Sequence, residues 1–371
     1  MARINLGNTP GYIALQVAPV MFRGGTGVGK SSSLEALAGA LERTFIPLYG
    51  ATHLPEDFSG YPIPDLKEGV VRMLPTSWVA RAKKKRSLIL IDEVTNVPSS
   101  TQGGLLSVLS ERRVGDDQLP ADTIMVGAMN PPELCPNAVP LAPAMRSRFC
   151  HFEWEVDYDH WFTGLRNGCE WTAPAFPVVP VHWTDLLAQF GSLVEAFLRS
   201  APDAREKLPA DDETLSFPNL RTWTYLVKVC AAAEACGYEW RKERKDPIYR
   251  TLCAAAVGTE HASMFLQYAQ KLDLLNPEEF LSGSVDYTYE NRPDANICLL
   301  TGIVKCLRSN PTKERWSRAA EAFIEVGSHE IESFLMQFKS FWKPVKDGGV
   351  RPDGWTPPKE TLGKLMALVQ S

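Results

Sequence analysis

Hydrophobic positions in the first 150 residues fall into short apolar runs separated by stretches of helical period. Residues 87–91 form a continuous apolar run, which is typical of a strand buried on both faces. Residues 31–41 place Leu34, Leu37 and Leu41 on one face of a helix. The expected strands cover 18–22, 45–49, 87–91 and 123–128, and the expected helices cover 31–41 and 101–111. This alternation predicts an α/β domain whose parallel strands are joined by right-handed crossovers.

The pattern changes after Phe149, where helical periodicity dominates. The expected helices cover 185–200, 221–236, 247–270, 295–308 and 312–341. Two short insertions are expected in the first part, a hairpin around 69–73 and a polar turn at 111–117. The chain is therefore expected to comprise an α/β domain over 1–155, a linker and helical region over 156–240, and a helical C-terminal region over 241–371.

Composition narrows the class of protein. With 44% hydrophobic and 22% charged residues the chain is that of a globular protein, and no apolar run reaches the roughly 18 residues that would span a bilayer. No secretory signal is recognised at the N-terminus, so a cytoplasmic protein is expected. None of the eight cysteines has C-x-x-C spacing, which favours reduced thiols over a zinc site.

Charge is distributed unevenly along the chain. Residues 1–150 carry 15 Lys and Arg against 13 Asp and Glu (+2), whereas residues 151–371 carry 24 against 31 (−7). Nonspecific binding of nucleic acid by the second part is disfavoured, because neutralising phosphates requires a basic surface. The basic run at 83–86 is expected to be the solvated end of a helix.

A glycine-rich turn after the first expected strand fits the phosphate-loop pattern G-x-x-x-x-G-K-[ST]. Its glycines allow backbone N–H groups to surround a phosphate, and the following helix N-terminus adds positive charge. Lys30 is expected to reach the β- and γ-phosphates and Ser31 to ligate Mg²⁺. The predicted nucleotide-contacting residues of the loop are Gly24, Gly25, Thr26, Gly27, Val28, Gly29, Lys30, Ser31 and Ser32.

Two adjacent carboxylates, Asp92 and Glu93, follow the buried run at 87–91. The carboxyl ends of parallel strands are where ligand crevices open, so the pair is expected near the phosphate loop. Asp92 is predicted to hold the magnesium ion through water. Glu93 is predicted to orient or deprotonate the attacking water.

The phosphate loop and the acidic pair together resemble those of the AAA+ ATPases. Residues 128–132 are similar to the sensor 1 element of that family, which implies that Asn130 hydrogen-bonds the γ-phosphate or the attacking water. Residues 143–149 resemble the segment that ends in an arginine finger, which stabilises transition-state charge on the nucleotide of a neighbouring subunit. Arg148 is the first candidate for the finger and Arg146 the second.

Residues 216–223 are similar to the family's sensor 2 element. The resemblance implies that Arg221, at the start of a lid helix within 156–240, reaches back to the phosphates. It also implies the P-loop NTPase architecture of a parallel sheet with helices on both faces, followed by a helical lid and a helical C-terminal region.

The proline-rich segment at 52–62 and the sensor 2 pattern are most similar to the MoxR-like and dynein-related group of AAA+ proteins. This resemblance implies ATP and Mg²⁺ as cofactors, a homo-oligomeric ring expected to be hexameric, and a protein client. MoxR-like proteins typically act with a partner that contains a von Willebrand factor A domain. The chain has no D-x-S-x-S motif of such a domain, so this partner would be another polypeptide. The absence of a guanine-reading N-K-x-D motif agrees with ATP, and no membrane partner is expected.

Three other functions compete with that of a protein remodeller. A nucleic-acid-dependent AAA+ motor, of the restriction or initiator type, is the main alternative, although the negative second part and the lack of a helix-turn-helix or zinc finger oppose it. A nucleotide-gated scaffold would not need Glu93. A small-molecule kinase would not explain Asn130, Arg148 and Arg221 together.

Overall fold

The structure is a computed structural model that describes residues 7–135, 139–170, 176–238, 247–271 and 275–370. The chain divides into two compact units. The first comprises residues 1–181 and 203–264, and the second comprises residues 182–202 and 265–371. This grouping differs from the three consecutive segments expected from the sequence. The helices between residues 203 and 264 pack with the α/β part, whereas the helix at 187–200 packs with the C-terminal helices.

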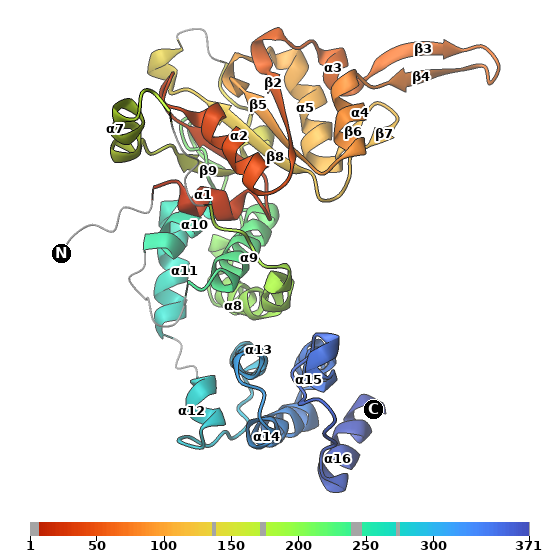
Figure 1. Ribbon diagram of the computed structural model, residues 1–371, viewed down its shortest axis with the longest axis vertical. Helices are drawn as coiled ribbons and strands as arrows, with labels where there is room; N and C mark the ends of the chain where they lie inside the picture. The colour runs from red at the N-terminus through yellow and green to blue at the C-terminus, as the bar shows by residue number, and fades with distance from the viewer. Residues whose placement is uncertain (1–6, 136–138, 171–175, 239–246, 272–274, 371) are drawn as a thin grey trace. The chain divides into compact units, whose positions relative to one another are not determined.

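A five-stranded parallel sheet forms the centre of the first unit, in the order β2-β5-β8-β1-β9 (Figure 1). The strands are β1 (Val20–Arg23), β2 (Thr44–Tyr49), β5 (Ser87–Asp92), β8 (Ile124–Met129) and β9 (Cys150–Glu153). All neighbouring pairs are parallel, with Val20 beside both Val126 and Cys150. Parallel strands need crossovers, so the helices must cover the sheet. The predicted α/β fold with a helical C-terminal region is confirmed.

Helices cover both faces of this sheet. On one face Met21, Ile89 and Met125 share a buried apolar cluster with Val79 and Val108. On the other face Phe22 meets the ring of Tyr12. The helices of the first unit are α1 (Thr9–Ala14), α2 (Lys30–Ala40), α3 (Pro55–Ser59), α4 (Ser77–Lys84), α5 (Ser99–Glu111), α6 (Pro143–Arg146), α7 (Tyr158–Arg166), α9 (Leu220–Ala235), α10 (Pro247–Val257) and the start of α11 (Thr259–Lys271). Of these, α9 and α10 pack against α1, and α10 also packs against β9.

Two antiparallel hairpins extend the first unit. One pairs β3 (Tyr61–Asp65) with β4 (Val70–Leu74), as expected near 69–73, and it projects away from the sheet (Figure 1). The other pairs β6 (Arg113–Val114) with β7 (Asp117–Gln118), within the expected polar turn. The backbone N–H of Asp116 donates to the Met73 carbonyl oxygen (3.0 Å), so the second hairpin is attached to the base of the first.

In the part that the structure describes, the second unit is built from helices and contains no strand longer than a single bridge between Pro344 and Arg351. It contains α8 (Leu187–Ser200), the end of α11, α12 (Pro277–Leu281), α13 (Pro293–Ser309), α14 (Lys313–His329), α15 (Ile331–Trp342) and α16 (Lys359–Gln370). Its core is aromatic: Trp316 and Phe323 both stack on Phe341, with ring centroids 4.3 and 3.9 Å apart. Among the described residues, no helix is long and apolar enough to cross a membrane.

Two stretches predicted as single helices are each divided in two. The stretch 247–270 breaks at Gly258, whose φ is +82° and whose position leaves no room for a side chain, because a Cβ would lie 2.7 Å from the Ser216 carbonyl oxygen. The stretch 312–341 breaks at Glu330, which has an extended backbone (φ −143°) and accepts a hydrogen bond from Asn296. Tertiary contacts therefore overrode a continuous helical period at both points.

Candidate nucleotide site

The loop between β1 and α2 has the geometry of a phosphate cradle. Gly27 and Gly29 have φ of +74° and +85°, a region that side chains other than glycine rarely adopt. No heavy atom lies within 4 Å of the position of a Cβ at either residue. Helix α2 begins at Lys30, so its first N–H groups are directed toward the loop. Backbone donors and open space thus coincide where a phosphate group would fit.

Four predicted residues from three elements are brought together beside this loop. The Lys30 ammonium donates to the Gly24 carbonyl (2.7 Å), the Gly25 carbonyl (2.8 Å) and Asn130 Oδ1 (3.1 Å). The Ser31 hydroxyl donates to Asp92 Oδ2 (2.7 Å). Burial lowers the pKa of the Lys30 ammonium, and the Asp92 carboxylate opposes that shift. A hydroxyl and a carboxylate in contact are oxygen ligands of the kind that Mg²⁺ prefers.

Glu93 adjoins the cluster in an unusual backbone conformation. Its φ of +53° lies in the left-handed region, which is costly for a residue with a side chain and is often found at functional positions. Its N–H donates to Asp92 Oδ1 (2.9 Å), and its carboxylate accepts a hydrogen bond from Asn96 Nδ2 (3.2 Å). The backbone turn thereby directs the two adjacent carboxylates differently, so that they can do different work.

The remaining loop residues divide between anchors and open positions. The Gly24 N–H donates to the Met129 carbonyl oxygen (3.1 Å), which ties the loop to β8. The Val28 carbonyl accepts from Trp154 Nε1 (3.1 Å). Gly25 is half-buried, whereas Thr26 and Ser32 are exposed.

The predicted arginines lie near the N-terminal ends of the strands, opposite the end that carries the phosphate loop. Arg148 stands two residues before β9 begins, and the phosphate loop follows the end of β1, which runs parallel to β9 in register. A strand of four residues spans about 13 Å. Asn219 caps α9 by accepting from the Arg221 and Thr222 N–H groups, and Arg221 Nη1 donates to the Ser147 hydroxyl oxygen (3.2 Å). In this structure the Arg221 side chain therefore contacts the segment before β9, and its expected contact with the phosphates stays a prediction.

The structure also separates the two finger candidates. Arg146 is 1% exposed, and its Nη1 donates to the carbonyls of Asp211 (3.0 Å) and Thr214 (2.7 Å). Arg148 is half-buried, and its Nη1 donates to the Ala144 carbonyl (2.5 Å). Arg146 thus holds a loop of its own chain, and Arg148 is the candidate that remains at the surface.

The comparison with known protein families agrees with this geometry. The sequence model of one family, described as the AAA domain of the dynein-related subfamily, matches residues 19–149. That span contains the phosphate loop, both carboxylates, Asn130 and Arg148.

Residues 19–149 are an AAA+ domain of the dynein-related subfamily. AAA+ domains bind nucleotides and belong to a family of ATPases. A protein from Cytophaga hutchinsonii, whose crystal structure is described as that of a candidate ATPase, is 16% identical, with a TM-score of 0.44 over 71% of this chain and 87% of that chain. No match is found among curated proteins.

Three residues around the AAA+ site went unrecognised in the sequence. Trp154 follows β9 and packs directly on the phosphate loop, since a Cβ added to Gly24 would lie 2.6 Å from the Cβ of Trp154. Cys135 accepts from Asn130 Nδ2 through its sulfur (3.7 Å), and Asn96 holds Glu93. The strand order would have placed Trp154 beside the loop, but no motif marks Cys135 or Asn96.

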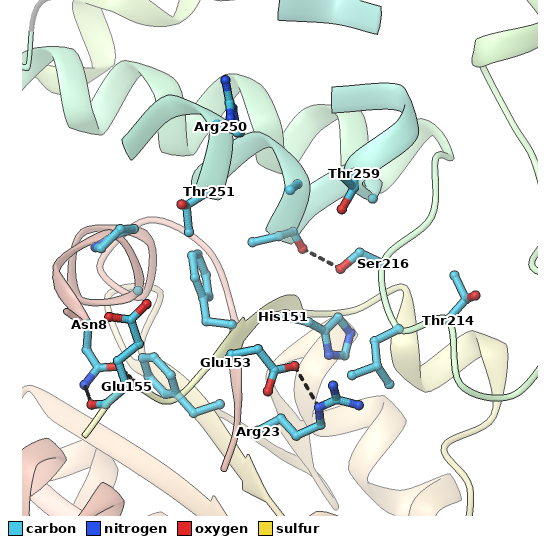
Figure 2. Close-up of a pocket in the computed structure, with 18 of the residues that line it drawn as sticks. Asn8, Arg23, His151, Glu153, Glu155, Thr214, Ser216, Arg250, Thr251 and Thr259 are labelled. Atoms are coloured by element: carbon cyan, nitrogen blue, oxygen red, sulfur yellow. Dashed lines mark hydrogen bonds and ion pairs between the residues drawn. The ribbon is translucent and has the colours of Figure 1, made fainter. Parts of the chain in front are cut away.

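A separate hollow of about 490 Å³ lies along the outer edge of β9, opposite α10 (Figure 2). The side-chain amide of Asn8 pairs with both the N–H and the carbonyl of Glu155, as a neighbouring strand would. Arg23 forms an ion pair with Glu153 (2.7 Å), and His151 lies beside them (Figure 2). None of the predicted nucleotide-site residues lines this hollow, so it is distinct from the phosphate loop.

Proposed function

We propose that the protein is a Mg²⁺-dependent ATPase that assembles as a homo-oligomeric ring, with six subunits expected, and uses ATP hydrolysis to remodel a protein client. The observation that carries this proposal is the position of Arg148 and Arg221. Both lie near the N-terminal ends of the strands, whereas Lys30, Ser31 and Asp92 lie near the C-terminal ends. The arginines can serve a nucleotide only if another subunit presents it to them.

The chain's own residues have complementary tasks in hydrolysis. Bound Mg²⁺ would supply positive charge to the phosphates, and Ser31 and Asp92 would hold it. Lys30 is directed into the loop by the Gly24 and Gly25 carbonyls. Glu93 offers a carboxylate that can accept a proton from water, and Asn130 offers an amide that can orient that water.

The β3–β4 hairpin supports contact with a protein. Several of its exposed side chains are apolar, beside the charged Lys67, Glu68 and Arg72: Leu66 at the tip is 92% exposed, Val71 62% and Val70 51%. A monomeric protein gains nothing from a two-stranded ribbon that is apolar and uncovered, because such a ribbon alone is marginally stable. We therefore assign this hairpin to client contact.

Side chains, rather than backbone pairing, would make that contact. The N–H and carbonyl of Met73 are bonded to Asp116 and so point away from β3. The backbone of Pro62, which pairs with Met73 in the register, therefore points away from β4, toward the free edge of β3. Pro64 lies two residues on and faces the same way. Two prolines deprive this edge of N–H donors, which prevents the addition of another strand.

A partner with a von Willebrand factor A domain completes the proposal. It rests on the MoxR-like character of the motifs at 52–62 and 216–223. Copurification with such a protein from the native cell extract tests this part separately from ring assembly.

The test of the central proposal is ATP turnover measured against protein concentration, with mass photometry on the same samples. Turnover per subunit should rise as rings form, require Mg²⁺, and vanish in Glu93→Gln, which keeps the shape of the side chain but removes the base. Arg148→Ala should lower turnover about 10³-fold without preventing assembly. Turnover that is independent of assembly, or unchanged in Arg148→Ala, would refute the ring mechanism.

A further inference from the structure

The two arginines are connected by a chain of hydrogen bonds rather than merely adjacent. The Ala144 carbonyl oxygen accepts from Arg148 Nη1 (2.5 Å) and from the Ser147 hydroxyl (3.1 Å). The Ser147 hydroxyl oxygen in turn accepts from Arg221 Nη1 (3.2 Å). One carbonyl at the start of α6 therefore fixes both guanidinium groups, one directly and one through a serine.

A tyrosine adds a second connection between the same two segments. Tyr225 lies four residues after Arg221 on α9, and so on the same helical face. Its hydroxyl donates to the Arg148 carbonyl oxygen (3.3 Å). Burial raises the pKa of Tyr225 to about 12, so the hydroxyl remains a donor at neutral pH. Helix α9 thus carries Arg221 and, through Tyr225, binds the backbone of Arg148.

Electrostatics make this restraint necessary. Burial lowers the pKa of Arg148, and the nearby positive charge of Arg221 adds to that lowering. Such groups move apart unless fixed bonds hold them. A pair of positive groups that is held in advance is what stabilises developing negative charge most effectively, since no reorganisation is then needed during the reaction.

We propose that Tyr225 and Ser147 are positioning residues that set Arg148 and Arg221 as one two-armed cationic unit for the nucleotide of the neighbouring subunit. This inference rests on the proposed ring mechanism. It adds that the position of α9 sets the position of the finger, so that a shift of this helix changes turnover in the neighbouring subunit and not in its own.

The test uses Tyr225→Phe, which removes only the hydroxyl, and Ser147→Ala as a second variant. Each should lower kcat about 10- to 100-fold, the size expected when a catalytic group is misplaced by about 1 Å. KM for ATP should stay within twofold, because the variant's own phosphate loop is intact. Tyr249→Phe is the control: this hydroxyl lies within hydrogen-bond distance of the Tyr238 carbonyl oxygen (2.5 Å) and of Glu234 Oε2 (3.0 Å), neither of which belongs to the arginine network, so its loss should leave kcat unchanged.

Mixed rings distinguish positioning from a general structural effect. Lys30→Ala subunits cannot turn over their own nucleotide, but they keep Tyr225, Arg148 and Arg221. Mixed with Tyr225→Phe subunits, they should raise turnover above the sum of the two separate proteins. In such rings a nucleotide bound to a Tyr225→Phe subunit can meet the intact arginine unit of a neighbouring Lys30→Ala subunit. The same restoration in a mixture of Lys30→Ala and Arg148→Ala reports on the ring mechanism itself.

The outcomes separate the two proposals. If Arg148→Ala is rescued by Lys30→Ala but Tyr225→Phe and Ser147→Ala keep full kcat, or lose activity that no mixture restores, the positioning roles are refuted and the ring mechanism stands. If the Arg148→Ala mixture shows no rescue, the ring mechanism fails. Should Tyr225→Phe not fold, as judged by its melting curve, Ser147→Ala decides the matter in the same assays.

Discussion

Arg146 and Arg148 stand two residues apart, yet the structure assigns them opposite kinds of work, and this difference can be measured. Arg146 is buried and donates to two backbone carbonyls, those of Asp211 and Thr214. It also forms an ion pair with Asp212 at 3.5 Å, although the Asp212 side chain is 74% exposed. Replacing Arg146 by Met keeps the apolar stem and removes the donors.

The expected loss of stability follows from these contacts. Hydrogen bonds from a charged donor contribute about 1.5 to 3 kcal/mol each, and the lower value applies because Asp211 and Thr214 are exposed and water can replace the lost donors. The ion pair with an exposed carboxylate adds about 0 to 1 kcal/mol. The sum is about 3 to 4 kcal/mol, which corresponds to a fall in melting temperature of about 10 °C for a unit of this size.

Thermal unfolding followed by circular dichroism, together with ATP turnover at a temperature where all variants are folded, checks the assignment. Arg146→Met should melt early but retain turnover. The free energy of unfolding of Arg148→Ala should lie within about 1 kcal/mol of that of the unmodified protein, whereas its turnover should fall about 10³-fold. If Arg146→Met melts normally and is inactive, the roles of the two arginines are reversed and the reasoning from burial is wrong.

Three further predictions concern stability. Burial lowers the pKa of His151 from 6.5 to about 4, so below pH 6.5 the unfolded chain takes up a proton that the folded chain does not. The free energy of unfolding should therefore fall by up to about 3 kcal/mol between pH 6.5 and pH 4, and urea unfolding of His151→Leu should show a smaller fall. Gly258→Ala should cost about 2 kcal/mol or more in thermal unfolding, because its φ is positive and a Cβ would meet a carbonyl, whereas Gly39→Ala, in open space within α2, should stabilise by about 0.5 to 1 kcal/mol; equal effects would contradict the backbone argument. Leu66→Ser combined with Val71→Ser should leave the melting temperature and basal turnover unchanged, and a fall of several degrees would show that the hairpin tip supports the fold.

The phosphate loop and the acidic pair were predictable because their chemistry is contained in short contiguous segments. Lys30 and Ser31 follow a glycine turn between a strand and a helix, and Asp92 ends an apolar run that is typical of a buried strand. Because the carboxyl ends of parallel strands meet at one end of the sheet, these segments also predicted the contact between Ser31 and Asp92. The β3–β4 hairpin was predicted for a similar reason, since its turn and strands are adjacent in the chain.

The position of Arg221 could not be predicted in the same way. Its motif defines a capped helix start, which the structure contains. Which nucleotide the helix faces depends on the packing of α9 and α10 against α1 and β9, contacts that join residues up to about 240 positions apart in the chain. No local pattern records those contacts. The breaks at Gly258 and Glu330 were missed for the same reason, because both depend on distant partners, Ser216 and Asn296.

The separation of the arginines from the carboxylates has a physical rationale of its own. A guanidinium close to Glu93 in the same chain would form an ion pair with it and weaken the base that the proposed reaction needs. With the strands between them, Arg148 and Glu93 of one chain are kept from pairing while both remain partly exposed. A nucleotide placed between two subunits would bring the two groups into one site only when phosphate charge lies between them. On this reasoning the proposed dependence of turnover on assembly follows from the parallel direction of the strands, and Arg148 moved to the carboxyl ends of the strands in its own chain would inhibit turnover rather than support it.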